Sequence, residues 1–266
     1  MSDIMGILTS VVVLRMGRVF AHLFTYPLRG QISTCLRHSV GCLLTLRAPL
    51  TVESSIVEML RDARKKIPIA VHGPFHDMYL GSIDPYIREA TLRRLSESAR
   101  LAAGIKAEFM TIHLNYIEEL HGRYRGEWIE NAAEALNILG KEGIRIHLEN
   151  TREDDPAIFA EILERSGSSS MCLDIGHVVA FSAKSIETWI GVLSPYIEEL
   201  HLHECSRGRD IHEPLGSGLI DWENVFLSLE RAGIDLEHIY LTLEPRNENE
   251  LIMSLRYLRD VIGIDD

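Results

Sequence analysis

Short apolar segments alternate with longer amphipathic segments along most of the chain. From residue 51 onward, runs rich in β-branched and apolar residues are each followed by a stretch with apolar positions at helical spacing. This alternation is typical of repeated βα units around a parallel sheet. The predicted strands cover residues 67–72, 109–113, 144–149, 171–174, 199–203 and 240–244. A strand at 41–46 and another within 5–24 bring the number to eight.

Eight βα units predict a single (β/α)8 barrel. Such a barrel typically needs about 250 residues, and the chain has 266. We therefore expect one domain over residues 1–266, with no room for a second. Residues 1–50 fit this scheme least, because arginines and glycines interrupt the strand-helix-strand pattern between residues 17 and 46. We expect an irregular start to the barrel there.

Three of the predicted helices have readable starts. A potential capping carboxylate precedes a helical pattern at Asp84, Asp155 and Asp221, and proline follows the first two. An aspartate at the N-cap accepts hydrogen bonds from free backbone N–H groups, and proline is favoured at the first helical position. We expect helices to begin at these three places.

The overall charge is acidic. The 27 lysines and arginines against 39 aspartates and glutamates give a net charge of −12, which disfavours broad electrostatic capture of nucleic acid. A local basic groove or bound metal ions could override this field. Residues 1–50 carry five arginines and one acid, or +4, which fits either an irregular barrel start or a basic flap beside a phosphate-bearing substrate.

Cysteine spacing and hydropathy indicate a cytoplasmic protein with reduced thiols. The four cysteines form neither a disulfide framework nor paired CxxC zinc ligands. The apolar run at 4–14 is interrupted by Arg15 and Arg18. It is therefore well short of the roughly 20 residues that a bilayer span needs. We expect a buried strand there rather than a signal peptide or membrane segment.

Polar side chains end six of the predicted strands, at the barrel edge where active sites lie. These side chains are His72, His113, Glu149, Asp174 with His177 shortly after it, His201 with His203, and Glu244. Crowded together without a partner, carboxylates and imidazoles would repel or desolvate one another. A divalent cation resolves this conflict, and a His, Asp and Glu set without Cys suits Mn, Zn, Co or Fe(II). The sequence therefore predicts a metal centre.

The candidate ligands differ in weight. Glu149, Asp174 and Glu244 end otherwise apolar strands, where a purely structural carboxylate would need a buried arginine that no strand supplies. His201 and His203 project from one side of their strand. One of them is therefore expected to reach the metal while the other stacks on or bonds a ligand.

Other polar residues near these strand ends are not expected to bind the metal. Glu204 faces away from His203, and His147 is expected one layer below Glu149, in the core or behind the ligands. We expect the histidines in loop or helix-end contexts on the solvated surface, namely His76, His121 and His238.

The segment after His203 carries a second cluster of chemistry. Asp210 and His212 lie in the motif DIHEPLGSG at 210–218, whose glycines allow backbone amides to approach a ligand. We expect a βα loop folded over the site, with Arg207 or Arg209 holding an anionic substrate. The alternative is a surface turn.

These motifs resemble the xylose-isomerase-like TIM-barrel superfamily. HGPF, LENT, LDIGH, ELHLHE, DIHEPLGSG and LTLEP occur in the family's order from about His72 to the end of the chain. The superfamily includes sugar and sugar-phosphate isomerases, ketose 3-epimerases and the AP-site nuclease endonuclease IV.

The resemblance to the epimerase-like branch implies one Mn-type ion held by Glu149, Asp174, His201 and Glu244. It also implies that His177 and Arg207 contact substrate oxygens. Glu149 and Glu244 would then move a proton between adjacent carbons of a small sugar or sugar phosphate while the metal stabilises an enediolate. This isomerase or epimerase activity is the leading hypothesis from the sequence.

The resemblance to endonuclease IV implies three zinc ions and phosphodiester hydrolysis of nucleic acid at an abasic site. Every ligand position has a counterpart, namely His72, His113, Glu149, Asp174, His177, His201, Asp210, His212 and Glu244. The residues after His113 and Glu149 depart from the nuclease pattern, and 174–177 has the isomerase-type form. Phe75 and Tyr79 could serve as wedges against DNA.

Two further possibilities stay open. The barrel could bind a ligand or partner without catalysis, with a structural metal, although structural zinc sites normally close with four protein ligands. The chain could also form a homo-oligomer.

Overall fold

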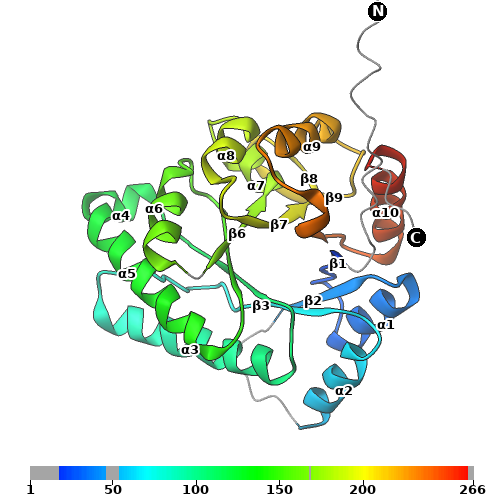
Figure 1. Ribbon diagram of the computed structural model, residues 1–266, viewed down its shortest axis with the longest axis horizontal. Helices are drawn as coiled ribbons and strands as arrows, with labels where there is room; N and C mark the ends of the chain where they lie inside the picture. Colours follow the sequence, from blue (N-terminus) through cyan, green and yellow to red (C-terminus); the bar gives the residue numbers. More distant parts are fainter. Residues whose placement is uncertain (1–17, 46–53, 168, 263–266) are drawn as a thin grey trace, which may run out of the picture.

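Eight parallel strands close into a barrel in the computed structural model, which describes residues 18–45, 54–167 and 169–262 (Figure 1). Around the barrel the strand order is β1-β10-β7-β6-β5-β4-β3-β2. The strands are β1 (Val19–Ala21), β2 (Gly41–Thr45), β3 (Ile69–His72), β4 (Met110–His113), β5 (Ile146–Glu149), β6 (Ser170–Asp174), β7 (Ile197–Leu202) and β10 (Tyr240–Leu243). The predicted (β/α)8 fold is confirmed.

Helices form an outer ring around these strands (Figure 1). They are α1 (Leu28–His38), α2 (Ser54–Arg64), α3 (Pro85–Gly104), α4 (Glu118–His121), α5 (Arg125–Leu139), α6 (Ala157–Ser166), α7 (Ile175–Phe181), α8 (Ile186–Leu193), α9 (Trp222–Arg231) and α10 (Glu248–Ile262). None of the described helices combines the length and apolar character that a membrane crossing requires.

The predicted helix starts are close to those observed. Asp84 caps α3 and Asp221 caps α9, each by accepting hydrogen bonds from backbone N–H groups of the first turn. Asp155 accepts a hydrogen bond from the backbone N of Ala157 at 3.2 Å. Pro156 is therefore the N-cap residue of α6 rather than its first helical residue.

Strand boundaries differ from the predicted ones by one or two residues. The predicted strands at 67–72 and 144–149 each begin two residues later, and the one at 199–203 runs from Ile197 to Leu202. The strand expected within 5–24 is the short β1. The apolar run at 4–14 and Leu46 lie outside the described residues.

An apolar layer fills the N-terminal end of the barrel. Phe20, Leu43, Ala70 and Phe109 form a buried cluster with Tyr240 packed against it. The rings of Phe20 and Phe109 meet edge to face, with centroids 5.3 Å apart. Polar side chains of the barrel interior therefore lie above this layer, toward the C-terminal strand ends.

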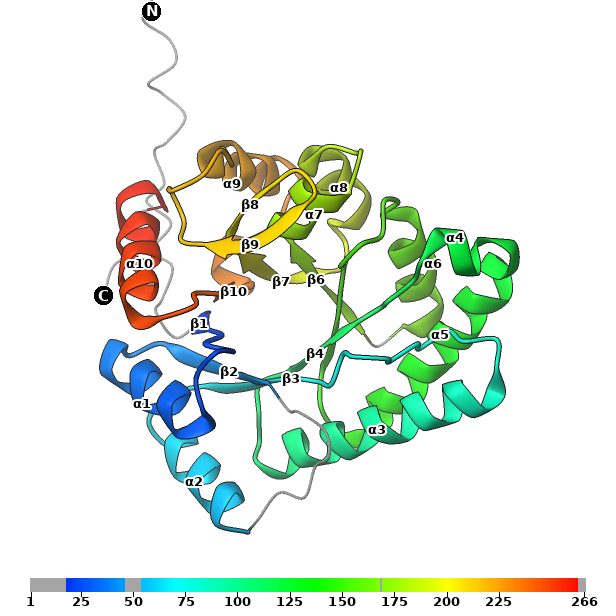
Figure 2. The same cartoon turned by 180° about the vertical axis from the view of Figure 1, so that it is seen from behind.

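A hairpin follows β7 where the sequence predicts a loop. It consists of the antiparallel strands β8 (Glu204–Ser206) and β9 (Arg209–Glu213), which pack against α7 (Figure 2). Gly208 adopts a φ of 73° between the two strands, a conformation that favours glycine. The hairpin brings residues 209–213 to the barrel mouth.

Candidate metal centre

A cavity of about 600 Å³ opens among the C-terminal strand ends. Its lining combines histidines and carboxylates with the apolar side chains of Phe24, Pro74, Phe75 and Met78. The candidate ligands fall into three adjacent groups.

The first of these, the His72 group, joins the ends of β3, β4 and β5. Nε2 of His72 and Nε2 of His113 lie 3.1 and 3.2 Å from Oε2 of Glu149. Nδ1 of His72 donates a hydrogen bond to the Gly73 carbonyl at 2.9 Å. In the neutral ring the lone pair is therefore on Nε2 and faces Glu149. The three ligand atoms are close enough to share one ion.

The central group gathers Glu149, Asp174 and Glu244 around His201. Nδ1 of His201 lies 3.2 Å from Oε1 of Glu149, 3.3 Å from Oε1 of Glu244 and 3.8 Å from Oδ2 of Asp174. All four residues are buried. Glu149 therefore belongs to both the His72 group and the central group.

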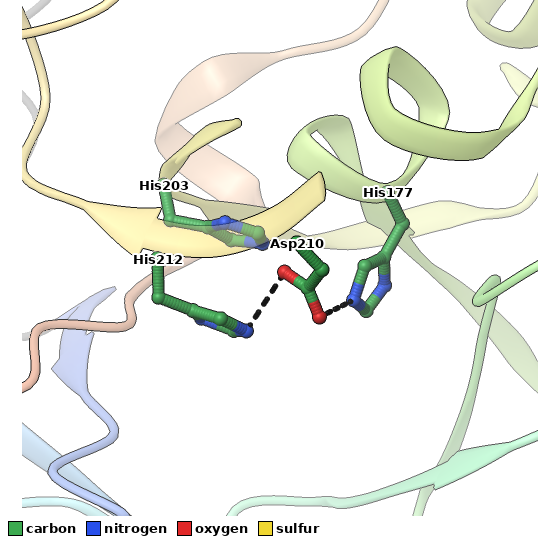
Figure 3. A group of neighbouring side chains, drawn as sticks. All are labelled: His177, His203, Asp210 and His212. Carbon is green, nitrogen blue, oxygen red and sulfur yellow. Dashed lines mark hydrogen bonds and ion pairs between the residues drawn. The ribbon is translucent and has the colours of Figure 1, made fainter. Parts of the chain in front are cut away.

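The hairpin group consists of His177 at α7 with Asp210 and His212 at β9 (Figure 3). Nε2 of His212 lies 3.0 Å from Oδ1 of Asp210, and Nε2 of His177 lies 3.4 Å from its Oδ2. Nδ1 of His212 lies 3.1 Å from Oε2 of Glu244, which links this group to the central one. His212 has a φ of 48°, an uncommon conformation for a non-glycine residue.

The turn from β6 into α7 explains the positions of two ligands. Asp174 ends β6 and caps α7, because its Oδ1 accepts a hydrogen bond from the backbone N of His177 at 2.7 Å. Residues three apart on a helix share a face, so Nδ1 of His177 lies 3.1 Å from Oδ2 of Asp174, with His177 in the cavity lining and Asp174 buried beside it. A Cβ on Gly176 would lie 2.3 Å from Cε1 of His203, so this turn requires glycine.

The electrostatics of the hairpin group favour charged side chains. Burial by itself would lower the pKa of His177, but Asp174 and Asp210 outweigh it and raise that pKa to about 10. Burial would also lower the pKa of His212, but the carboxylates of Asp210 and Glu244 outweigh it and raise that pKa to about 11. Without a cation, protons on these rings balance the carboxylates.

The carboxylates of the central group show the complementary shift. Burial by itself would raise the pKa of Glu149 and Glu244, but the nearby His201 imidazole and other histidines hold both well below the usual range. Both glutamates are therefore anionic at neutral pH, which is the form that binds metal.

The donor set fits divalent ions. Nδ1 of His201 and Nδ1 of His212 are buried atoms without a hydrogen-bond partner among the described residues, although carboxylate oxygens surround them. Imidazole and carboxylate ligands suit zinc or manganese. The thiol of Cys172 also lies near Glu149 and His201, but burial raises its pKa well above the ordinary value.

Several secondary predictions can be placed against the structure. His203 lies on the His212 ring, with centroids 4.0 Å apart, and its Nε2 is 3.1 Å from both oxygens of Asp174. Phe75 lines the cavity and stacks on His113 at 4.9 Å. Both residues are thus beside the candidate ligands.

Residues predicted to lie away from the ligands mostly do so. Glu204 faces away from the cavity and accepts a hydrogen bond from Nε1 of Trp222 at 2.8 Å. His147 is fully buried in the barrel interior. His238 is exposed, and His76 is exposed while lining the cavity.

One prediction stays untested and one needs correction. Arg207 and Arg209, of which one is predicted to hold an anionic substrate, are both exposed and outside the cavity lining, and Arg207 donates a hydrogen bond to the Ser182 carbonyl. Their role toward a substrate stays a prediction. The sequence places His121 on the solvated surface, but it is partly buried and stacks on Trp128 at 5.5 Å.

The sequence interpretation missed His22. This residue follows β1, and its Nδ1 lies 2.7 Å from Oε1 of Glu244 while its Nε2 lies 2.5 Å from Oγ1 of Thr45. The signal was present, because VFAH at 19–22 repeats the pattern of IAVH at 69–72. Glu199 in β7, which contacts His201, was also missed.

Comparison with known proteins gives one family and several relatives. Residues 42–261 match the sequence profile of the family described as xylose isomerase-like TIM barrel. The protein MJ1311 of Methanocaldococcus jannaschii is 26% identical over 223 residues, which cover 77% of this chain and 73% of that protein. Probable endonuclease 4 of Mycobacterium bovis is 27% identical over 181 residues, which cover 63% of this chain and 70% of that protein.

Solved structures share the fold. A D-tagatose 3-epimerase-like protein superposes with a TM-score of 0.80 at 22% identity, covering 92% of this chain and 97% of that chain. A Thermus thermophilus protein soaked with ZnCl2 superposes with a TM-score of 0.76 at 27% identity, and the match covers 92% of this chain and 98% of that chain. At 22% identity, the first likeness concerns the barrel architecture alone.

Proposed function

This chain belongs to the xylose isomerase-like TIM-barrel family, and we propose that it is a divalent-metal-dependent enzyme that hydrolyses a phosphoester bond. One observation carries this proposal: nine candidate ligands form three groups that touch one another through Glu149 and Glu244. We propose that these groups hold up to three zinc or manganese ions.

The hairpin group supports phosphoester hydrolysis over proton transfer. Moving a proton between adjacent carbons needs one ion, for which the central group already supplies four candidate ligands. Asp210 and His212 come from a hairpin added outside the barrel sheet, and proton transfer gives them no role. Clustered ions would activate a water molecule and neutralise charge on the leaving oxygen.

The protein's own side chains would prepare this chemistry. His72 and His113 hold one oxygen of Glu149 while His201 faces the other, so the carboxylate is fixed between two groups. Phe24, Pro74 and Phe75 give the cavity an apolar wall. Such a wall excludes water and strengthens electrostatic interactions with a bound substrate.

An abasic site in DNA is the first substrate to test, given the likeness to probable endonuclease 4. Protein reloaded with Zn²⁺ or Mn²⁺ would be assayed on an abasic duplex and on bis(p-nitrophenyl) phosphate, a small phosphodiester without bases. We expect hydrolysis of at least one, lost on chelation and in Glu149→Gln. Fully loaded protein that cleaves neither phosphodiester would refute the proposal.

Isomerisation or epimerisation of a sugar or sugar phosphate is the second candidate. It is favoured by Glu149 and Glu244, whose carboxylates both approach Nδ1 of His201 and could move a proton on two sides of a bound sugar. Sugars incubated with the loaded enzyme in D₂O would then take up deuterium at carbon. Uptake that persists after loss of the hairpin group would favour this reaction.

A further inference from the structure

Glu199 is a buried carboxylate beneath the candidate metal centre. It lies in β7 two residues before His201, so both side chains point into the barrel, Glu199 one layer deeper. Neither residue has measurable solvent exposure. Resting on the proposed metal centre, we infer that Glu199 is a positioning residue that dictates which nitrogen of His201 binds the ion.

Four side chains converge on this carboxylate. Oε2 accepts hydrogen bonds from Oγ1 of Thr111 at 2.7 Å and from Nδ1 of His147 at 2.9 Å. Oε1 accepts hydrogen bonds from Oγ1 of Thr242 at 2.7 Å and from Nε2 of His201 at 3.1 Å. The donors come from β4, β5, β10 and β7, so Glu199 is held from several sides of the barrel.

This arrangement fixes the hydrogen positions on His201. A carboxylate accepts hydrogen bonds and has no hydrogen to donate, so the ring nitrogen that faces it must carry one. Nε2 of His201 is therefore N–H. Nδ1 faces Glu149 and Glu244, which would hold a hydrogen there in metal-free protein, although it has no hydrogen-bond partner among the described residues. Nδ1 is therefore the nitrogen that would exchange its hydrogen for an ion, while Glu199 keeps the hydrogen on Nε2.

A role confined to packing would not account for this geometry. Burying a carboxylate in a barrel interior is costly unless its partners are exact in number and direction, and an apolar residue would fill the same space. Thr111, Thr242 and His147 already satisfy Glu199. The additional contact with Nε2 of His201 allows Glu199 to influence the candidate metal centre.

The neighbouring His147 ring limits how far Glu199 can move. Its ring stacks on Phe109, with centroids 4.5 Å apart and planes 19° from parallel, in the apolar layer that fills the barrel end.

Removing a carboxylate that orients a metal-binding histidine generally lowers metal affinity about 10–100-fold. A comparable effect is expected for Glu199.

Nuclear magnetic resonance of the wild-type protein tests the tautomer directly. Full-length protein labelled with ¹⁵N in histidine is stripped of metal and titrated with ¹¹³Cd²⁺, and His201 is assigned by loss of its signals in His201→Gln. We expect the Nε2 hydrogen to persist throughout and cadmium coupling to appear on Nδ1. Coupling on Nε2 would overturn the inference, whereas absence of coupling to any histidine would overturn the metal centre itself.

Glu199→Gln tests the same inference by affinity. The amide places an NH₂ group against one of the two imidazoles, so the ring hydrogens of His201 or His147 must rearrange. We expect Zn²⁺ affinity, measured by competition with a chromophoric chelator, to fall about 10–100-fold. Folded Glu199→Gln with unchanged affinity and an unchanged His201 tautomer would contradict it.

Glu153→Gln is the matched control. Glu153 is also a buried carboxylate, but it accepts hydrogen bonds from the backbone N of Tyr116 and of Thr151 and contacts none of the candidate ligands. We expect this variant to keep the wild-type Zn²⁺ affinity and the His201 tautomer. An equal loss of affinity in both variants would show that any buried glutamate matters, and would overturn a specific role for Glu199.

Discussion

Replacing Asp210 with asparagine separates the two candidate reactions. The change removes one negative charge from the hairpin group and keeps the shape of the side chain. Asp210 is the carboxylate that contacts Nε2 of both His177 and His212, at 3.4 and 3.0 Å. The central group keeps all four of its candidate ligands.

The expected effect is large on hydrolysis and small on stability. The Asp210 side chain is 32% exposed, so its hydrogen bond with His177 and its ion pair with His212 should contribute only about 1–2 kcal/mol to the free energy of unfolding. If the ion of the hairpin group is lost with Asp210, developing negative charge loses one stabilising group, which typically lowers kcat about 10²–10³-fold, or about 2.7–4 kcal/mol of barrier. Bound ions per chain should fall by one.

The assay combines metal counting with both activities. Wild-type and Asp210→Asn proteins are stripped, reloaded and analysed by elemental analysis, then assayed for phosphodiester cleavage and for deuterium uptake by sugars. Asp235→Asn is the control, because Asp235 is an exposed aspartate that also contacts a histidine, with Nδ1 of His238 at 2.7 Å, away from the cavity lining. It should match the wild type in every measurement.

Full retention of ions and of phosphodiesterase activity in Asp210→Asn would refute the reasoning. A different result would favour the isomerase reaction. In that case the wild type would have no phosphodiesterase activity, and Asp210→Asn would lose one ion but still exchange deuterium into sugars.

Three further predictions concern pH, packing and metal removal. Because His177 and His212 have pKa values raised to about 10 and 11, each must release a proton when the hairpin group binds Zn²⁺. The logarithm of the affinity should therefore rise with pH below 10 with a slope approaching two, and a flat profile in Zn²⁺ titrations at pH 6–8 would contradict this. Gly176→Ala should displace His203 and lower both Tm and ion content, whereas Gly191→Ala, whose Cβ meets open space in α8, should raise stability by up to about 1 kcal/mol. Chelation should lower the Tm of the wild type by several degrees, because an ion at 100 times its Kd contributes about 2.7 kcal/mol; equal melting curves with and without chelator would count against tight binding.

The sequence was enough to find most of the candidate site because parallel strands end together. His113 pairs in register with Glu149, and Asp174 pairs with His201. A polar residue at the end of each apolar strand is therefore placed on the same rim, whatever the helices between them do. This is why residues up to 172 positions apart, from His72 to Glu244, could be grouped without a structure.

Other features depend on information that the strand pattern does not contain. His22 follows a strand of only three residues within an arginine-containing segment, so the apolar signal before it was weak. Glu199 stands at the start of the predicted strand, where alternation predicts its direction but not the four donors around it. The pairing of β8 with β9, and the contact of Arg207 with the Ser182 carbonyl, depend on tertiary packing.

The charge of the cavity bears on which substrate the centre accepts. Among the described residues, no lysine or arginine lines the cavity, whereas Glu149, Asp210 and Glu244 do. A phosphate group would therefore meet a net negative surface in metal-free protein at alkaline pH, once the imidazoles have lost their protons. Bound divalent ions would reverse that charge, so at alkaline pH a phosphoester should bind only to the loaded protein, whereas a neutral sugar should depend on the ions through chelation alone. The dependence of binding on ionic strength separates these cases, because attraction of an anionic phosphate weakens with added salt and chelation of neutral hydroxyls does not.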